Sequence, residues 1–515
     1  MQEFIRKFEK KASFVLSGFD RVLFRGLLRA LIYPDGMKAH LSRKDVPRRL
    51  FGQHVERTTE ALKQASLAEA KALDRPIRYL ASSRVRKEAE ARKLLASDPV
   101  DSGLVCVLTC VEPCKTYEMY RNREAKRLEL VYRERKCLHL YHYYLDPCFG
   151  WMHARIQTWY PFHIQVCING REWLARRMDE AGIAYTRHEN SFPVIEDPVR
   201  AQELMHELVA QDWPRVLDGF AHRLNPAHDE LLAPHLRYYW TAHQTEWATD
   251  VAFTSSRGLQ HIYPQLVWGA ITAFSSRDVL RFLGKQYQCH FAGEVTSHYR
   301  DRPEGLSIRH QANNNGVKMY DKAGRILRIE TTINNPADIT VYRPKQGDEP
   351  KQATRAALRK GVCDLSRRAN VSQRANERYL DALSHLDTDQ PLGRLLAPMT
   401  KRVCRSGTVY RGLRPWEGHD LALLALIQRP EYHLGGFRNV DIACDLYPRH
   451  HASSHKRRAA SARVSYRLRL LRAHGLIRKQ HRSRRYRITK KGQEVCAALS
   501  LAQHATVQQL TAKAA

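Results

Sequence analysis

The C-terminal end of the chain constrains the fold more than any other part. A helix predicted from Ala459 to His474 places Val464, Leu468 and Leu471 on one stripe, and Gly475 then supplies the left-handed residue that ends a helix. The run that follows, GLIRKQHRSRRYRITKKGQEV, is typical of a strand, a basic turn, a second strand and a new helix. This order of elements predicts a small, separately packed unit.

Two shorter helices are predicted ahead of this stretch. The segment Pro415–Gln428 has one apolar face, and Asn439 is expected to cap a second helix that ends before Pro448. The third helix would then expose small and basic residues, and the hairpin would carry arginines at its tip. The residues expected to bind DNA are Arg458, Arg463, Ser465, Tyr466, Arg469, Arg482, Arg484 and Arg485.

The succession LRLLRAHGLIRK followed by RRYRITKKGQEV resembles the winged helix-turn-helix modules of MarR-like and ArsR-like bacterial regulators. The likeness covers about 100 residues at the C-terminus. It implies that the helix around Arg463–Arg469 reads the DNA groove and that the hairpin, the wing, holds the backbone. Those regulators are much shorter chains, so the resemblance describes only a module of this one.

The charge of the chain also favours a polyanionic partner. Its 515 residues include 85 Lys and Arg against 53 Asp and Glu, a formal net charge of +32. Residues 401–515 hold 24 of these basic residues and only 6 acidic ones, which is more than half of the surplus. Double-stranded DNA is therefore the expected partner, and RNA or single-stranded DNA is an alternative for the rest of the chain.

The fold class expected for the whole chain is multidomain α+β. Residues 1–100 are predicted to form a helical N-terminal layer, with a short strand or helix around Phe14–Leu31. Residues 101–195 are predicted as an α/β region and residues 196–400 as a helical region with a β-hairpin at 317–333. Residues 401–515 are the winged-helix domain. No internal repeat is evident.

A second group of residues suggests chemistry on that hairpin. Tyr320, Asp321 and Glu330 are candidate catalytic residues, because a tyrosine beside carboxylates that bind Mg²⁺ or Mn²⁺ can nick DNA. The pattern YDK followed by LRIE loosely resembles a segment of rolling-circle replication initiators, but their separate tyrosine motif is missing here. The structural alternative is a cross-strand salt bridge between Lys318 or Arg328 and Glu330.

Four weaker patterns have ordinary structural explanations. His163 and Gln165 have the spacing of a metal-binding strand, and Asp20 could join Glu112 or Asp146 in a nuclease site. The remaining two patterns are expected to be buried strand cysteines and a packed aromatic edge that could also stack on bases. These are Cys106, Cys110 and Cys114, and then Trp159, Tyr160 and Phe162.

Several protein classes lose support from what the sequence lacks. It has no P-loop, dinucleotide fingerprint or nucleophile elbow at a credible strand-to-helix turn. No apolar run approaches the roughly 18 residues that span a bilayer, so we expect a cytoplasmic protein without membrane contact. Its 11 cysteines lack paired spacings, which predicts reduced thiols and no disulfides.

Two functions remain from the sequence, and whether the chain is an enzyme stays open. The preferred one is a DNA-binding protein whose winged helix docks on duplex DNA while the N-terminal body contacts a second nucleic acid or partner. The alternative is a metal-dependent nickase or transposase of a mobile element, targeted by the same winged helix. No cofactor is assured beyond Mg²⁺ or Mn²⁺ in that alternative, and a homodimer is compatible with either.

Overall fold

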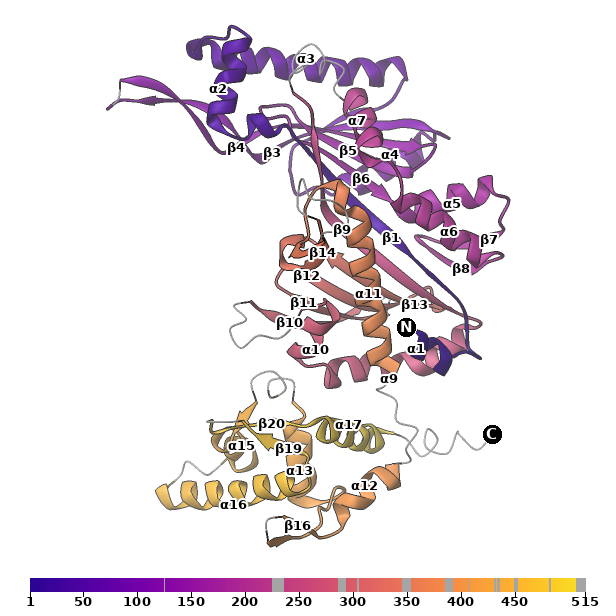
Figure 1. Ribbon diagram of the computed structural model, residues 1–515, viewed down its shortest axis with the longest axis vertical. Helices are drawn as coiled ribbons and strands as arrows, with labels where there is room; N and C mark the ends of the chain where they lie inside the picture. The colour runs from indigo at the N-terminus through magenta and orange to yellow at the C-terminus, as the bar shows by residue number, and fades with distance from the viewer. Residues whose placement is uncertain are drawn as a thin grey trace.

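The computed structural model describes the chain except for residues 125, 225–235, 286–292, 303–304, 345–352, 385–391, 406, 430–431, 433–435, 449–452, 481–482 and 506–515. Its largest feature is one sheet of eleven strands in the order β10-β11-β12-β13-β9-β1-β6-β5-β4-β3-β2 (Figure 1). The strands are β1 (Ala12–Leu27), β2 (Ile77–Leu80), β3 (Gly103–Asn122), β4 (Arg127–Asp146), β5 (Gly150–Gln157), β6 (Ile164–Asn169), β9 (Tyr239–Phe253), β10 (Val295–Arg302), β11 (Gly305–Ala312), β12 (Asn315–Lys322) and β13 (Ile326–Ile333).

The two central strands, β1 and β9, pair antiparallel along almost their whole lengths. Gly18 of β1 lies opposite Ala248 of β9. A Cβ at Gly18 would stand 1.9 Å from Cε of Met205, so a helix packs directly onto the backbone of β1 at this point. A bulge between Phe19 and Arg21 then shifts the register of β1 by one residue.

The sheet consists of two halves with a similar strand order, except that the first half has an extra edge strand, β2, which pairs parallel with β3 and has no counterpart in the second half. In each half a central strand is followed by helices and then by a four-stranded antiparallel meander, whose last strand returns to pair with the central one. The helices of the first half are α2 (Pro34–Arg43), α3 (Phe51–Ala72) and α4 (Lys87–Ser97), and those of the second are α9 (Ser256–Ala273) and α10 (Ser276–Phe282). The chain therefore contains a topological repeat that its sequence does not reveal.

The repeat continues beyond each meander. The first half goes on through α5 (Gly170–Glu180), the hairpin β7 (Tyr185–His188) with β8 (Ser191–Ile195), and α6 (Pro198–Val209). The second goes on through a short 3-10 turn, the hairpin β14 (Thr340–Arg343) with β15 (Thr354–Ala357), and α11 (Leu365–Ser384). Outside this scheme, α1 (Gln2–Lys7) packs against α11, and α7 (Trp213–Leu224) packs near β6.

The two halves bury their faces differently. In the first half both faces of the sheet are covered. One face packs with α3 and α7 in one core, and the other, through alternate side chains such as Tyr141 and Tyr143, packs with α4 in a second core. In the second half α9, α10 and α11 cover one face, where Val251, Ile329 and Tyr379 belong to a single core. The opposite face of the second half carries polar side chains and forms a cleft.

The C-terminal residues form their own core. Its elements are α12 (Leu392–Thr400), β16 (Val403–Arg405), β17 (Thr408–Tyr410), α13 (Gly418–Ile427), β18 (Phe437–Arg438), α15 (Asn439–Leu446), α16 (Ser454–Ala473), β19 (Ile477–Lys479), β20 (Arg485–Ile488) and α17 (Lys490–His504). Leu423, Ile442 and Leu468 meet in this core, and β18, β20 and β19 form a three-stranded sheet. In Figure 1 this unit lies below the large sheet, beyond α11.

The mixed α+β class is confirmed, but the N-terminal layer is not simply helical. Residues 1–100 supply β1, the central strand, because Phe14, Leu16, Phe19 and Val22 pack into the sheet rather than onto a helix face. The three regions predicted before residue 401 also share one sheet. Within the described residues, no helix has both the length and the apolar character to cross a membrane.

Candidate functional site

The first candidate site is the surface of the C-terminal unit. Val464, Leu468 and Leu471 are buried as predicted, and Gly475 ends the helix region with a φ of +74°. Asn439 does not cap α15. It is the first residue of that helix, and its amide donates to Oγ of Ser465 at 2.8 Å. This contact holds α15 against α16.

The arginines predicted on α16 lie on its solvent side. Arg458, Arg463 and Arg469 are exposed, and Tyr466 is 44% exposed. Ser465 is half-buried, and its hydroxyl is engaged by Asn439. The helix therefore presents cations and one aromatic ring outward, whereas Ser465 contributes to the packing of α15 on α16.

The arginines of the hairpin have different roles. Arg484 is exposed in the connection between β19 and β20. Arg485 is the first residue of β20 rather than part of the tip, and its guanidinium donates to the carbonyl of Gly436 at 3.1 Å. Arg482 lies outside the described residues.

The second candidate site is the cleft on the open face of the second half-sheet. Its volume is about 950 Å³, and it extends from β1 and β9 across β13 and β12 to β11 and β10. Glu88 of α4 borders it, so the cleft lies on the side of the sheet that α4 covers in the first half. The other charged residues and histidines that line it are Asp20, Arg21, His188, Glu189, Glu246, His298, Arg300, Arg309, Lys318, Asp321, Lys322 and Glu330.

A buried ion cluster closes the inner wall of this cleft. Arg328 of β13 donates from Nε to Asp250 at 2.6 Å and from Nη2 to the same carboxylate at 2.8 Å. Nη1 of Arg328 also reaches Asp20 at 3.5 Å, and Arg171 approaches Asp250 at 3.1 Å. Asp20 accepts further bonds from the amide of Asn190 at 2.8 and 2.9 Å.

Asp250 and Arg328 hold each other charged. Burial alone raises the pKa of Asp250, but Arg328 and Arg171 outweigh it and bring this pKa below its ordinary value. Burial alone lowers the pKa of Arg328, but Asp250 and Asp20 outweigh it and raise that pKa well above the ordinary value. Both arginine side chains are fully buried.

Tyr320 and Glu330 form a hydrogen-bonded pair next to this cluster. The phenol of Tyr320 donates to Oε2 of Glu330 at 2.7 Å, and Nζ of Lys318 lies 3.8 Å from the centre of the Tyr320 ring. The hairpin brings them together as predicted, because its turn at Ala323 and Gly324 sets Tyr320 opposite Arg328 and Lys318 opposite Glu330. Lys318 stands opposite Glu330, as the salt-bridge alternative requires, whereas Arg328 pairs with Asp250 instead.

Carboxylates from three strands face this part of the cleft. Burial, followed by the negative charges of Asp20 and Glu246, raises the pKa of Glu330. Glu246 accepts from Arg21 at 2.6 Å and from Gln244 at 3.0 Å. Among the described residues, the oxygens of the three carboxylates do not all lie within 4.8 Å of one another. A divalent ion would have to draw them closer together.

Asp321 is not part of this pair. It lies opposite Leu327, which belongs to the helix-covered core, so it is out of phase with Tyr320 along the strand. Burial raises the pKa of Asp321, and its Oδ1 is buried without a hydrogen-bond partner among the described residues.

The nuclease partners predicted for Asp20 lie elsewhere. Glu112 is held by Lys87 at 2.6 Å and by Tyr141 at 2.7 Å. Asp146 accepts from the backbone nitrogen of Cys148 at 2.9 Å in the turn after β4.

The residues of the other weak patterns lie mostly in packed parts of the body. The two residues of the predicted strand pair contact arginines, His163 with Arg25 at 3.1 Å and Gln165 accepting from Arg155 at 3.1 Å. Tyr160 and Phe162 are buried, with Trp159 packed partly buried against the same core, and Cys106 and Cys110 are buried as expected. The expectation is wrong for Cys114, which is only half-buried.

Sequence reasoning missed Glu246, Asp250 and Arg171. Each has a structural partner more than 70 residues away in the sequence. Arg171, for example, donates to the carbonyl of Ala248, 77 residues further along the chain. No local spacing indicates such a contact. The alternation within β9, which places Glu246 and Asp250 on one face, is the signal that the sequence offers.

Comparisons with protein-family models, with curated proteins and with solved structures find no match to this chain.

Arg328→Met should destabilise the protein by about 3–5 kcal/mol, because it leaves Asp250 and Asp20 buried without their main counter-ion. Urea unfolding of the full chain measures this. Arg309→Met is the control, since Arg309 borders the same cleft but is half-exposed, and its cost should stay below about 0.5 kcal/mol. Equal costs for both variants would contradict a structural role of the ion cluster.

Relative to wild type, Glu330→Gln should become increasingly stabilising as pH rises through the raised pKa of Glu330. The pKa of Glu330 is higher in the folded protein than in the unfolded chain. The protonated carboxyl therefore contributes its full stability below the pKa of the unfolded chain, and this contribution is lost as pH rises through the pKa of the folded protein. Glu118 is the opposite case, because Arg135 and Arg133 lower its pKa, and Glu118→Gln should cost stability at pH 8 but not at low pH. Parallel unfolding curves across pH for the Glu330 variant and wild type would refute the first expectation.

Proposed function

We propose that the protein binds duplex DNA through residues 401–515, folded as a winged helix. The observation that supports this most directly is the outward face of α16, where Arg458, Arg463 and Arg469 are exposed in a unit whose sequence holds 24 basic and 6 acidic residues. Such a surplus favours a partner that neutralises it. The order of α13, α15, α16, β19, β20 and α17 supports the winged-helix interpretation.

In this proposal α16 enters the major groove. Arginines on an exposed helix face can pair with guanine edges, while Tyr466 contacts phosphate. The contact between Asn439 and Ser465 fixes α15 behind α16, as a helix-turn-helix requires. The hairpin of β19 and β20 would lie along the backbone, with Arg484 exposed at its turn and Arg487 exposed on β20.

The large body would bind a second nucleic acid in its cleft. His298, Arg300 and Arg309 on the outer strands are set apart from the carboxylates at the centre, so the cleft offers cations to a phosphate backbone at its outer end. A single strand of RNA or DNA suits a cleft with cations at one end better than a rigid duplex does, because a single strand can bend into it. The duplex is instead assigned to the winged helix. A homodimer would place two winged helices on half-sites about 34 Å apart.

Replacing both Arg463 and Arg469 by alanine should weaken duplex binding by at least tenfold and relax its sequence preference, since each base-reading arginine contributes about 1–3 kcal/mol. Fluorescence anisotropy on the full chain, with specific and shuffled duplexes at several salt concentrations, measures both effects. Arg414→Ala is the matched control, because Arg414 is an exposed arginine of the same unit that precedes α13 and pairs with Glu417. The affinity of this control variant for duplex DNA should stay within twofold of wild type.

Arg484→Ala with Arg487→Ala should weaken all duplexes alike. The slope of log affinity against log salt should also fall by about 0.9 for each phosphate that the variant no longer binds. If these changes and the α16 changes have no effect while cleft substitutions abolish duplex binding, the proposed interface is wrong.

A second function is favoured by the bond between Tyr320 and Glu330. In a cleft with Lys318 beside the ring, Tyr320 could attack a phosphodiester while Glu330 takes its proton. A bond from the tyrosine oxygen to phosphorus would form, and the bond from phosphorus to one sugar ester oxygen would break, with that oxygen taking a proton from water to become the free hydroxyl of the nicked strand. Burial raises the pKa of Tyr320 well above its ordinary value, so a neighbouring base is required. Mg²⁺ or Mn²⁺ held by the carboxylates would stabilise the charge on phosphate.

Incubation with supercoiled plasmid and Mg²⁺ or Mn²⁺ tests this second function. Nicked plasmid should form, and Tyr320→Phe and Glu330→Gln should each reduce its rate by at least 100-fold. Tyr299→Phe is the control, because Tyr299 is a half-exposed tyrosine on β10 whose loss should leave the rate unchanged. Absence of nicked product, or equal loss in all three variants, would leave the chain as a binding protein.

A further inference from the structure

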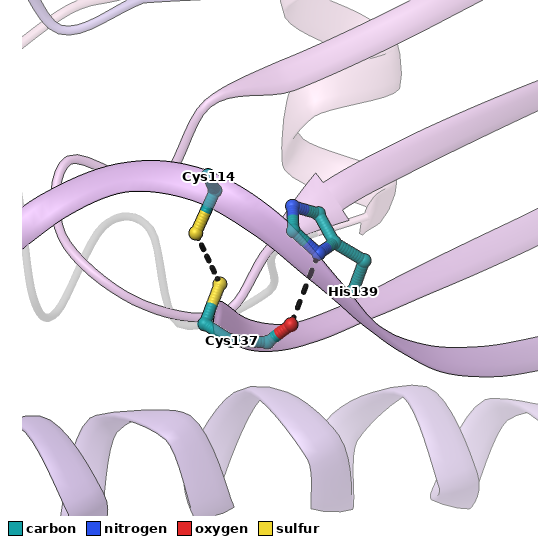
Figure 2. A group of neighbouring side chains, drawn as sticks. All are labelled: Cys114, Cys137 and His139. Atoms are coloured by element: carbon teal, nitrogen blue, oxygen red, sulfur yellow. Dashed lines mark hydrogen bonds between the residues drawn. The ribbon is translucent and has the colours of Figure 1, made fainter. Parts of the chain in front are cut away.

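A cysteine pair and a histidine lie together where two long strands leave the sheet. Cys114 is on β3, and Cys137 and His139 are on β4, two residues apart and therefore on one face. Sγ of Cys114 and Sγ of Cys137 are 3.0 Å apart. One ligand atom from each of the three residues lies within 4.8 Å of the other two (Figure 2).

The imidazole of His139 is oriented by the backbone. Its Nδ1 lies 3.2 Å from the carbonyl oxygen of Cys137, a distance at which Nδ1–H donates and leaves the lone pair of Nε2 available. Metal-binding histidines are commonly oriented in this way by a second hydrogen bond. Figure 2 shows the thiol of Cys114 pointing toward that of Cys137, with the His139 ring beside them.

We propose that Cys114, Cys137 and His139 bind a Zn²⁺ ion. Thiolates and imidazole are the ligands that zinc prefers, at about 2.3 Å for sulfur and 2.0–2.1 Å for nitrogen, whereas Mg²⁺ and Ca²⁺ select oxygen. The burial of Cys137 and His139, which are 4% and 1% exposed, protects such an ion from exchange. Glu112, opposite Cys137, is held by Lys87 and Tyr141, so the fourth position is assigned to water.

A disulfide fits the strand register less well than a metal does. Cys114 lies opposite Arg135 and Cys137 opposite Glu112, so the two cysteines are diagonal neighbours. Diagonal neighbours in an antiparallel pair stand about 7–8 Å apart, beyond the span of about 4.4–6.8 Å that a disulfide bridges between Cα atoms. A zinc ion separates its sulfur ligands and tolerates the wider spacing.

The position of the site indicates what the ion would do. β5 pairs with β4 only from His139 to Asp146, so beyond this point β3 and β4 continue as a two-stranded arm. Tyr117 and Leu130 pack the arm into the main core, but among the described residues no third strand extends its pairing. An ion bridging both strands at the last sheet-supported position would anchor the arm to the sheet.

The test is the metal content of the full-length protein, purified under reducing conditions and exposed to one equivalent of Zn²⁺ followed by gel filtration. Elemental analysis should find about one zinc per chain. Replacing zinc with Co²⁺ should give a sulfur-to-cobalt charge-transfer band. Cys114→Ser and His139→Ala should each lower retained zinc at least fivefold.

Cys106→Ser is the matched control, because Cys106 is a buried cysteine on the same strand that lies opposite Tyr143, away from the cluster, and its loss should leave the zinc content unchanged. If a variant fails to fold, alkylation of the wild-type protein decides. Zinc should protect Cys114 and Cys137 from alkylation, and a chelator should expose them. A wild-type protein that retains less than a tenth of an equivalent, with both thiols alkylated equally with and without zinc, overturns the proposal. So does a Cys114–Cys137 disulfide peptide from metal-free protein.

Discussion

The pairing of β1 with β9, fastened by Asp20, Asp250, Arg171 and Arg328, is the constraint on which the rest of the body depends. Four charges buried together are tolerated only when each faces an opposite charge at hydrogen-bonding distance, and here Arg328 grips Asp250 with two nitrogens. The bulge between Phe19 and Arg21 lets Asp20 join this cluster. A slip of one residue would turn these side chains to the wrong face.

The two halves around this pairing differ in which faces of the sheet are covered by helices. Each has a central strand, a meander, a small hairpin and a helix, but α4 packs onto one face of the first half and leaves the matching face of the second half open. That open face holds Glu330, whose raised pKa means that its charged form costs stability. A buried carboxylate beside the carboxylates of Asp20 and Glu246 does not help the protein to fold, so ligand binding is the simpler explanation for it.

Local patterns could be predicted from the sequence, and distant contacts could not. The stripe of Val464, Leu468 and Leu471 and the hairpin around Ala323 and Gly324 depend on neighbours within a few residues, and both are confirmed. The strand character of β1 is hard to see in the sequence, since its bulges interrupt the alternation. Glu246 and Asp250 acquire their roles only through β1 and β13, so no spacing in the sequence could have assigned them.

Hydrogen–deuterium exchange of the full chain with and without a saturating duplex tests the central claim most directly, because it locates the DNA on the protein without any substitution. We predict slower exchange in α16 and in the β19–β20 hairpin, with the cleft strands β10 to β13 unchanged. Protection confined to the cleft strands, with α16 exchanging as in the free protein, would contradict duplex binding through the C-terminal unit.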